Sequence, residues 1–246
     1  MNTDLRLKET LSSGEGSQQR KSKQSSIKRF LRDNGLSLVL LALFVSFLAG
    51  QLISGWLTYN EEQDEHQQAQ IGFIQYLETG ACGEAVFENW ESEFLQMCLY
   101  VVLTAFLFQR GSAESKDPDK KEEVDEDSSS KLERLYAPQA VKRGRIFGMI
   151  YNHSLSIAFM GLFLMSFLAH AVWGVKAYNE MAIEHGKTAL SVWQYFGTSQ
   201  FWFESFQNWQ SEFLAIFAIV VLSIWLREKG SPESKPVAAA HSETGR

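Results

Sequence analysis

Apolar positions along the chain are gathered into four blocks that alternate with polar segments. Residues 36–57 contain no charged side chain, and residues 155–175 contain none apart from one histidine. Both blocks are long enough to cross a hydrocarbon layer of about 30 Å, since a helix rises about 1.5 Å per residue. A soluble chain of this size could hardly bury two such helices on all sides. The pattern therefore predicts a membrane protein.

The other two apolar blocks are shorter. Residues 94–108 and 213–226 carry no charged side chain, but a helix over 213–226 alone would reach only about 21 Å. Each of these helices must therefore begin in the polar residues that precede its block. We predict four transmembrane helices, at about residues 36–58, 88–109, 155–177 and 207–227.

The sequence also contains an internal repeat with a period of about 119 residues. Residues 89–95 read NWESEFL and residues 208–214 read NWQSEFL. After the apolar block that follows each copy, residues 111–116 and 230–235 share the pattern Gly-Ser-x-Glu-Ser-Lys. Each repeat thus contains two predicted helices, so both repeats begin and end on the same side of the membrane.

The expected fold is an all-α integral membrane protein built from two parallel helical-hairpin repeats. A pseudo-twofold axis along the membrane normal should relate them. We assign residues 27–116 to the first repeat and residues 146–235 to the second, with a cytoplasmic linker at 117–145. The polar ends of the chain, residues 1–26 and 236–246, are predicted to be disordered tails.

Charge sets the orientation of this fold. The net charge of −6 is modest, but Lys and Arg gather before the first predicted helix, between the second and third, and after the fourth. The loop at residues 60–88 has neither, and the loop at 177–207 has only Lys187. Because cytoplasmic loops of membrane proteins are enriched in Lys and Arg, we expect both termini and the linker to be cytoplasmic. The pattern therefore predicts a multi-pass membrane protein with this orientation.

Four motifs in the first repeat resemble those of an uncharacterised family of bacterial membrane proteins known as a domain of unknown function. They are N-G-L-S-L at 34–38, Y-N-E at 59–61, F-x-N-W-x-S-E-F-L at 87–95 and G-S-x-E-S-K at 111–116. The resemblance is close over residues 34–116 and looser over 146–235, where Pro232 stands at the position of Ala113. The resemblance implies a bacterial membrane location, so we expect a multi-pass protein of the bacterial inner membrane. It implies no particular activity, cofactor or partner.

Polar side chains at helical spacing form a candidate seam between the repeats. Residues three and four apart lie on one helical face, and such a face should meet protein or water, not lipid. The seam comprises Asn89, Ser92, Glu93 and Gln96 on the second helix and Asn208, Ser211 and Glu212 on the fourth. It is either a hydrogen-bond network between repeats or a polar vestibule open to the outside. Trp90 and Trp209 are predicted to anchor the helices in the outer aromatic belt.

His170 joins the seam as the one ionisable residue well inside a predicted span. Such residues usually face the interior of a bundle and often mark a functional position. A neutral imidazole hydrogen-bonded between helices is the other interpretation. The first repeat has Gly50 at the corresponding position, so the repeat itself does not require a histidine.

No catalytic, metal or cofactor motif is recognisable. The two cysteines are far apart in the predicted topology, and Glu65 and His66 are sequence neighbours that do not share a helical face. We therefore assign no catalytic residue, metal or cofactor. The sequence favours a non-enzymatic structural, interaction or envelope-stress protein, with a small channel, transporter or sensor as the alternative. Expected partners are the lipid bilayer and a second copy or a small membrane protein, and no nucleic acid.

Overall fold

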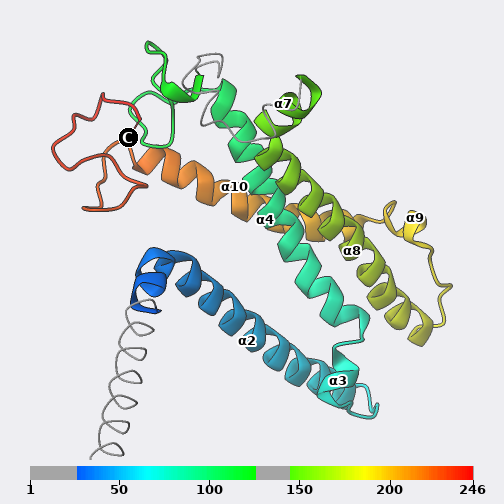
Figure 1. Cartoon of the computed structure of the whole chain (residues 1–246). Helices are drawn as coiled ribbons and strands as arrows, with labels where there is room; N and C mark the ends of the chain where they lie inside the picture. Colours follow the sequence, from blue (N-terminus) through cyan, green and yellow to red (C-terminus); the bar gives the residue numbers. More distant parts are fainter. Residues whose placement is uncertain (1–26, 126–144, 246) are drawn as a thin grey trace, which may run out of the picture. The chain divides into compact units, whose positions relative to one another are not determined.

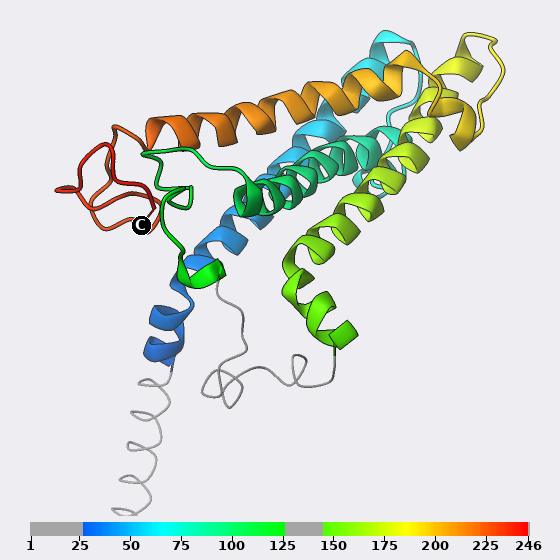
Figure 2. The same cartoon turned by 90° about the horizontal axis from the view of Figure 1, so that it is seen from above.

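The computed structural model describes residues 27–125 and 145–245, and all regular structure within these residues is helical. The predicted tail at 1–26 and most of the predicted linker lie outside the described residues. The chain forms two compact units, which divide between Phe73 and Ile74. Because the regular structure is helical, the all-α fold class is confirmed (Figures 1 and 2).

The first unit contains helix α2, Gly35–Glu65. Its side chains are mostly apolar and exposed, and Asn60 near its end is buried. The Asn60 side-chain amide makes two hydrogen bonds to the backbone beyond the helix: Nδ2 donates to Ile71 O over 3.1 Å, and Oδ1 accepts from Ile71 N over 2.8 Å. Trp56 Nε1 also donates to Ile71 O, over 2.8 Å. Helix α3, Phe73–Tyr76, follows at the boundary of the two units.

The second unit contains three long helices: α4, Gly80–Phe106; α8, Ser154–Glu184; and α10, Ser199–Leu222. Short elements connect them: the 3-10 helix η1, Glu123–Asp125; α7, Arg145–Asn152; and α9, Val192–Tyr195. Helices α4 and α8 lie side by side and run in opposite directions (Figures 1 and 2). Helix α10 packs against α4, where Gln96 Nε2 donates to Glu212 O over 2.8 Å.

Glycine allows the close approach of α4 and α8. A Cβ atom on Gly80 would lie 2.1 Å from Ala177 N, and one on Gly83 would lie 2.2 Å from the Trp173 ring. At the other end of the same interface, Cys98 Sγ donates to Ser156 O over 3.5 Å. Small residues are the usual means by which helices approach closely in membranes.

The apolar core of the second unit lies at one end of α8. Ala171 and Val175 pack there against Tyr195 and Phe201, and all four are buried. Thr198 caps α10, since its hydroxyl accepts from Phe201 N over 3.3 Å. The cap starts α10 immediately after α9, and so brings these two aromatic side chains against α8.

The helices begin earlier than hydropathy predicts. Helix α4 starts at Gly80 and α10 at Ser199, whereas the predicted starts are 88 and 207. Thr79 and Thr198 cap these helices within polar sequence, and hydropathy does not detect a cap. Helices α2 and α8 likewise continue to residues 65 and 184, past their predicted ends. The additional turns matter, because they carry charged side chains into the site described below.

The C-terminal segment also differs from its prediction as a disordered tail, since residues 236–245 follow a defined path. Gly245 N donates to Ser112 O over 3.0 Å, and Gly111 N donates to Thr244 Oγ1 over 2.8 Å. The buried Lys235 Nζ lies within hydrogen-bond distance of four backbone carbonyls, those of Gly111, Ala240, His241 and Glu243, which share its three N–H donors. This ammonium anchors the segment to the loop that follows α4.

Local hydrogen bonds recur at corresponding positions of the two sequence copies. Asn179 makes the same pair of hydrogen bonds to Leu190 that Asn60 makes to Ile71: Nδ2 donates to Leu190 O over 2.8 Å, and Oδ1 accepts from Leu190 N over 2.7 Å. The hydroxyls of Ser115 and Ser234, in the two Gly-Ser-x-Glu-Ser-Lys motifs, each accept from the backbone N–H six residues earlier. The repeated motifs therefore form the same turns.

Two of the described helices are long and apolar enough to cross a membrane, by length and composition: α2, and residues Ser154–Ile183 of α8. Over the most apolar part of each helix, no side chain of α2 is buried and 17% of those of α8 are buried.

Candidate functional site

Three glutamates lie along one face of α4. Glu84, Glu88 and Glu91 follow each other at steps of four and three residues, so they project from the same side of the helix. Glu91 is fully buried, and the other two are half-buried. Acidic side chains on the buried face of a helix require partners, because burial of an unpaired charge is costly.

The principal partner is His170 on α8, whose side chain is fully buried. Its Nδ1 lies 2.9 Å from Glu91 Oε2, and its Nε2 lies 3.3 Å from Glu204 Oε2 on α10. The Phe201 ring stacks on the imidazole with centroids 4.8 Å apart. His170 thus joins the three long helices of the second unit. With a hydrogen on both ring nitrogens, it would donate to both carboxylates.

Glu91 is held in place from two sides. Its second oxygen, Oε1, accepts from Trp209 Nε1 over 3.0 Å, while Oε2 faces His170. Both carboxylate oxygens therefore have a partner, and the orientation of the His170 ring is fixed by a residue that is itself fixed.

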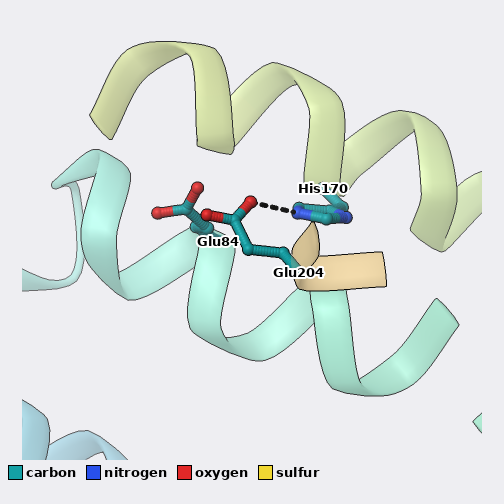
Figure 3. Close-up of side chains that lie close together, drawn as sticks. All are labelled: Glu84, His170 and Glu204. Carbon is teal, nitrogen blue, oxygen red and sulfur yellow. Dashed lines mark hydrogen bonds and ion pairs between the residues drawn. The ribbon is translucent and has the colours of Figure 1, made fainter. Parts of the chain in front are cut away.

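Glu84 and Glu204 approach each other on the opposite side of the imidazole (Figure 3). The Tyr195 hydroxyl lies 3.1 Å from Glu84 Oε1 and 3.0 Å from Glu204 Oε2. Burial raises the pKa of Tyr195, and the two nearby carboxylates raise it further. The hydroxyl therefore stays protonated, but its one hydrogen can satisfy only one carboxylate at a time.

A glycine makes room for this approach. A Cβ on Gly174 would lie 2.8 Å from the Tyr195 ring and hydroxyl and 2.9 Å from Glu84 Oε1. Any side chain at this position of α8 would displace both groups.

The cluster has more negative than positive groups. Glu88 lies within electrostatic reach of His170 and Glu204, so four carboxylates surround one imidazole. Within residues 27–125 and 145–245, no lysine or arginine forms an ion pair with any of the four. Full ionisation would leave a net charge of about −3 in a partly buried site, which is strongly unfavourable unless a glutamate takes up a proton or a further positive group binds.

Two buried hydroxyls beside the cluster also lack partners. Ser166 Oγ and Ser205 Oγ are completely buried and make no hydrogen bond within the described structure. Ser166 lies one turn before His170 on α8, and Ser205 lies on α10 between Phe201 and Trp209, the face that contacts the cluster. Buried hydroxyls are normally hydrogen-bonded, so both are free to bind a further group.

The structure brings His170 of the predicted seam and Trp209, a predicted interfacial anchor, into this cluster. The other seam residues are divided. Ser92 and Gln96 are buried, Asn208 and Glu212 are half-buried, and Asn89, Glu93 and Ser211 are exposed. The second predicted anchor, Trp90, is half-buried. Asn89, Ser92, Asn208 and Ser211 bond to carbonyls of their own helices. Two seam residues join α4 to α10: Gln96 donates to the backbone of α10, and the Asn208 side chain hydrogen-bonds Glu88 of the cluster.

The remaining cluster residues were absent from the predicted seam: Glu84, Glu88, Glu91, Tyr195 and Glu204. A signal for three of them does exist, because the α4 glutamates have helical spacing. This spacing is not apparent in the predicted helix, because that helix begins at residue 88 and leaves Glu84 in a loop. For Glu204 and Tyr195, no local pattern shows that they face a helix distant in sequence.

A separate cavity of about 670 Å³ lies at the other end of α4. Tyr100 donates to Glu114 Oε2 over 2.5 Å at its wall, and Lys116 Nζ pairs with Asp125 Oδ1 over 2.6 Å. The hydrogen bond from Lys116 lowers the pKa of Asp125 below its ordinary value of 3.8. This cavity therefore contains an ion pair between a lysine and a carboxylate, in contrast to the cluster around His170.

The fold and this site can be compared with known proteins. A family model described as a domain of unknown function, DUF6766, matches residues 27–246. The chain belongs to the DUF6766 family. No curated protein and no solved structure matches it. Membership confirms the resemblance noted from the motifs and carries no statement of activity, so function must be argued from the site.

Proposed function

We propose that this DUF6766 protein is a four-helix protein of the bacterial inner membrane that binds a cation between α4, α8 and α10. It would act as a small carrier or sensor of that cation, and not as an enzyme. The sequence suggests either a non-enzymatic structural or interaction protein or a small channel, transporter or sensor, and this proposal takes the second function.

Four spans are supported by the lengths of α4 and α10. These helices have 27 and 24 residues, which correspond to about 40 and 36 Å at about 1.5 Å per residue. Both lengths exceed a hydrocarbon core of about 30 Å. Large apolar side chains on α10, including Phe206, Leu214 and Phe217, are exposed, as lipid-facing side chains would be.

The repeated turns support two hairpins of the same orientation. Asn60 with Ile71 and Asn179 with Leu190 form matching bonds just after α2 and α8. The Lys and Arg distribution favours cytoplasmic termini. In this orientation the glutamate–histidine cluster lies in the outer half of the bundle.

The observation that carries the proposal is the convergence of four carboxylates on His170. A purely structural role would be served as well by apolar side chains, since replacing buried ion pairs by apolar groups is often neutral or stabilising. A cation bound among the carboxylates would remove the excess negative charge, and the unpaired Ser166 and Ser205 hydroxyls could take part.

A thermal-shift panel tests this function. The full chain in detergent micelles is melted with Na⁺, K⁺, Mg²⁺, Ca²⁺, Mn²⁺ and Zn²⁺ in turn. A cation at about 100 times its Kd stabilises by about 2.7 kcal/mol, which should raise the Tm by about 5–10 °C for a chain of this size. Glu204→Gln should abolish the rise, whereas Glu212→Gln, on the same helix but outside the cluster, should retain it. If no cation raises the Tm of the unmodified chain, the proposal is wrong.

The topology has its own test. Alkaline phosphatase fused at residue 68 should be active, and the same enzyme fused at residue 125 should be inactive, because it is active only outside the cytoplasm. Activity only at residue 125 would reverse the orientation.

A further inference from the structure

We propose that the cation is a divalent transition-metal ion, Zn²⁺ or Mn²⁺, bound by His170 Nε2 and by carboxylate oxygens of Glu84 and Glu204. This inference rests on the cation-binding function proposed above and specifies its ligand.

The three ligands are already gathered. One ligand atom from each of Glu84, His170 and Glu204 lies within 4.8 Å of the other two. Atoms bonded to one ion at about 2.1 Å can be at most about 4.2 Å apart. Small rotations of the two glutamate side chains would therefore bring all three into a coordination sphere. The side chains come from three helices, α4, α8 and α10 (Figure 3).

The other side of the imidazole carries the support that metal-binding histidines usually have. A ligating histidine typically donates its second ring N–H to a carboxylate, which fixes the tautomer and raises the basicity of the ligand. Glu91 Oε2 lies 2.9 Å from His170 Nδ1, and Trp209 holds the other Glu91 oxygen over 3.0 Å. With hydrogen on Nδ1, the Nε2 lone pair points towards Glu204 and is free for a metal.

The Tyr195 hydroxyl is a further oxygen atom beside the proposed ligands. The Tyr195 hydroxyl contacts both ligand carboxylates, and a metal between them would remove the conflict over its single hydrogen. The Ser205 hydroxyl, buried and unpaired on the adjacent face of α10, is available for a metal-bound water. An ion at this point thus provides partners for groups that otherwise lack them.

The donor set selects the metal. One imidazole with two carboxylates suits Zn²⁺ or Mn²⁺, whereas Mg²⁺ and Ca²⁺ prefer oxygen alone and Cu⁺ prefers sulfur. Among the described residues both cysteines, Cys82 and Cys98, are free, and neither belongs to the cluster.

The repeat predicts the number of ions. Aligning the two copies places Phe203 opposite Glu84, Ala85 opposite Glu204 and Gly50 opposite His170. None of these three can ligate a metal, so the second repeat-related position has lost the ligand set. We expect one ion per chain.

The test is equilibrium dialysis of the full chain in detergent against Zn²⁺ alone and Mn²⁺ alone, with metal counted by mass spectrometry. The unmodified protein should bind one ion per chain. Glu84→Gln and Glu204→Gln should weaken binding at least 100-fold, and Glu91→Gln, which removes the support of His170, by about 10–100-fold. Glu212→Gln is the matched control and should bind as the unmodified protein does.

A second measurement uses the unmodified chain alone, so it does not require any variant to fold. Co²⁺ bound to the unmodified chain should give a visible spectrum without thiolate charge-transfer bands, and Zn²⁺ should displace it. Failure to bind Zn²⁺ and Mn²⁺, or equal binding by Glu204→Gln and Glu212→Gln, overturns the inference. If the thermal-shift panel responds to Na⁺, K⁺, Mg²⁺ or Ca²⁺ alone, the cation-binding function survives and the transition-metal assignment fails.

Discussion

The contact of Gly80 with α8 gives a strong prediction about packing. A Cβ atom at this position would lie 2.1 Å from Ala177 N and 2.5 Å from Ala177 Cα. Both are backbone atoms, so no side-chain rotation can relieve the clash. Ordinary contact begins at 3.4 Å, so in Gly80→Ala the two helix backbones would have to separate by more than about 1 Å.

The magnitude follows from the cost of overpacking, which is typically about 1–3 kcal/mol. Alanine is favoured over glycine in helix interiors by about 0.5–1 kcal/mol, which offsets part of the cost of overpacking. The offset is small here, because Gly80 is the first residue of α4. We expect a net loss of about 2 kcal/mol, and a Tm lower by about 4–8 °C. Circular dichroism of the chain in detergent micelles measures it.

Gly161 on α8 is the matched control. It also lies in a helix, but a Cβ there would meet nothing within 4 Å. Gly161→Ala should therefore leave the Tm unchanged or raise it by a few degrees. If Gly80→Ala behaves like Gly161→Ala, the close packing of α4 on α8 is wrong, and with it the placement of Glu84 beside His170.

Three more predictions follow from single contacts. Trp209→Phe removes the N–H that fixes the buried α4 carboxylate and should weaken Zn²⁺ binding by about 10-fold in dialysis. Lys235→Met leaves four carbonyls without their donor and should cost about 1–3 kcal/mol, whereas exposed Lys229→Met should cost almost nothing in the same melting assay. Lys116 lowers the pKa of Asp125 in the folded chain. The stability that this pair contributes to the fold is therefore fully present above pH 3.8, and it is lost as the pH falls through the lower pKa of the folded chain. An NMR titration of Asp125 should give a midpoint below 3.8, and a value at or above it in the folded chain contradicts the pair.

The hydropathy pattern predicts the helical fold class well, because apolar blocks must be helical in a membrane. It also identifies His170, since an ionisable side chain in an apolar block is conspicuous. Helix ends are harder, because caps such as Thr79 and Thr198 lie within polar sequence that resembles a loop.

The sequence shows a row of glutamates on α4 but does not decide which of them faces His170, for a geometric reason. Glu91 and Glu93 both belong to the repeated motif, but two residues correspond to a rotation of about 200° around a helix. The rotation of α4 therefore decides which glutamate is buried, and packing against α8 sets that rotation through Gly80 and Gly83. The structure buries Glu91 and exposes Glu93. Glu93 of the predicted seam therefore points away from the cluster, whereas Ser92 of the seam is buried as Glu91 is.

Departures from the repeat are as informative as its matches. The residues shared by both copies make turns and caps, as Asn60 and Asn179 do. The cluster residues Glu84, His170 and Glu204 instead occur in one copy only. The three proposed ligands thus lie at positions where the two copies differ.

The most direct test of the central claim is anomalous diffraction at the zinc edge from crystals of the full chain grown with Zn²⁺. We expect one strong peak per chain, about 2.0–2.1 Å from His170 Nε2 and within about 2.2 Å of oxygen atoms of Glu84 and Glu204. A difference map without a peak at these three side chains, or with the strongest peak at an exposed histidine such as His66 or His185, would contradict the account.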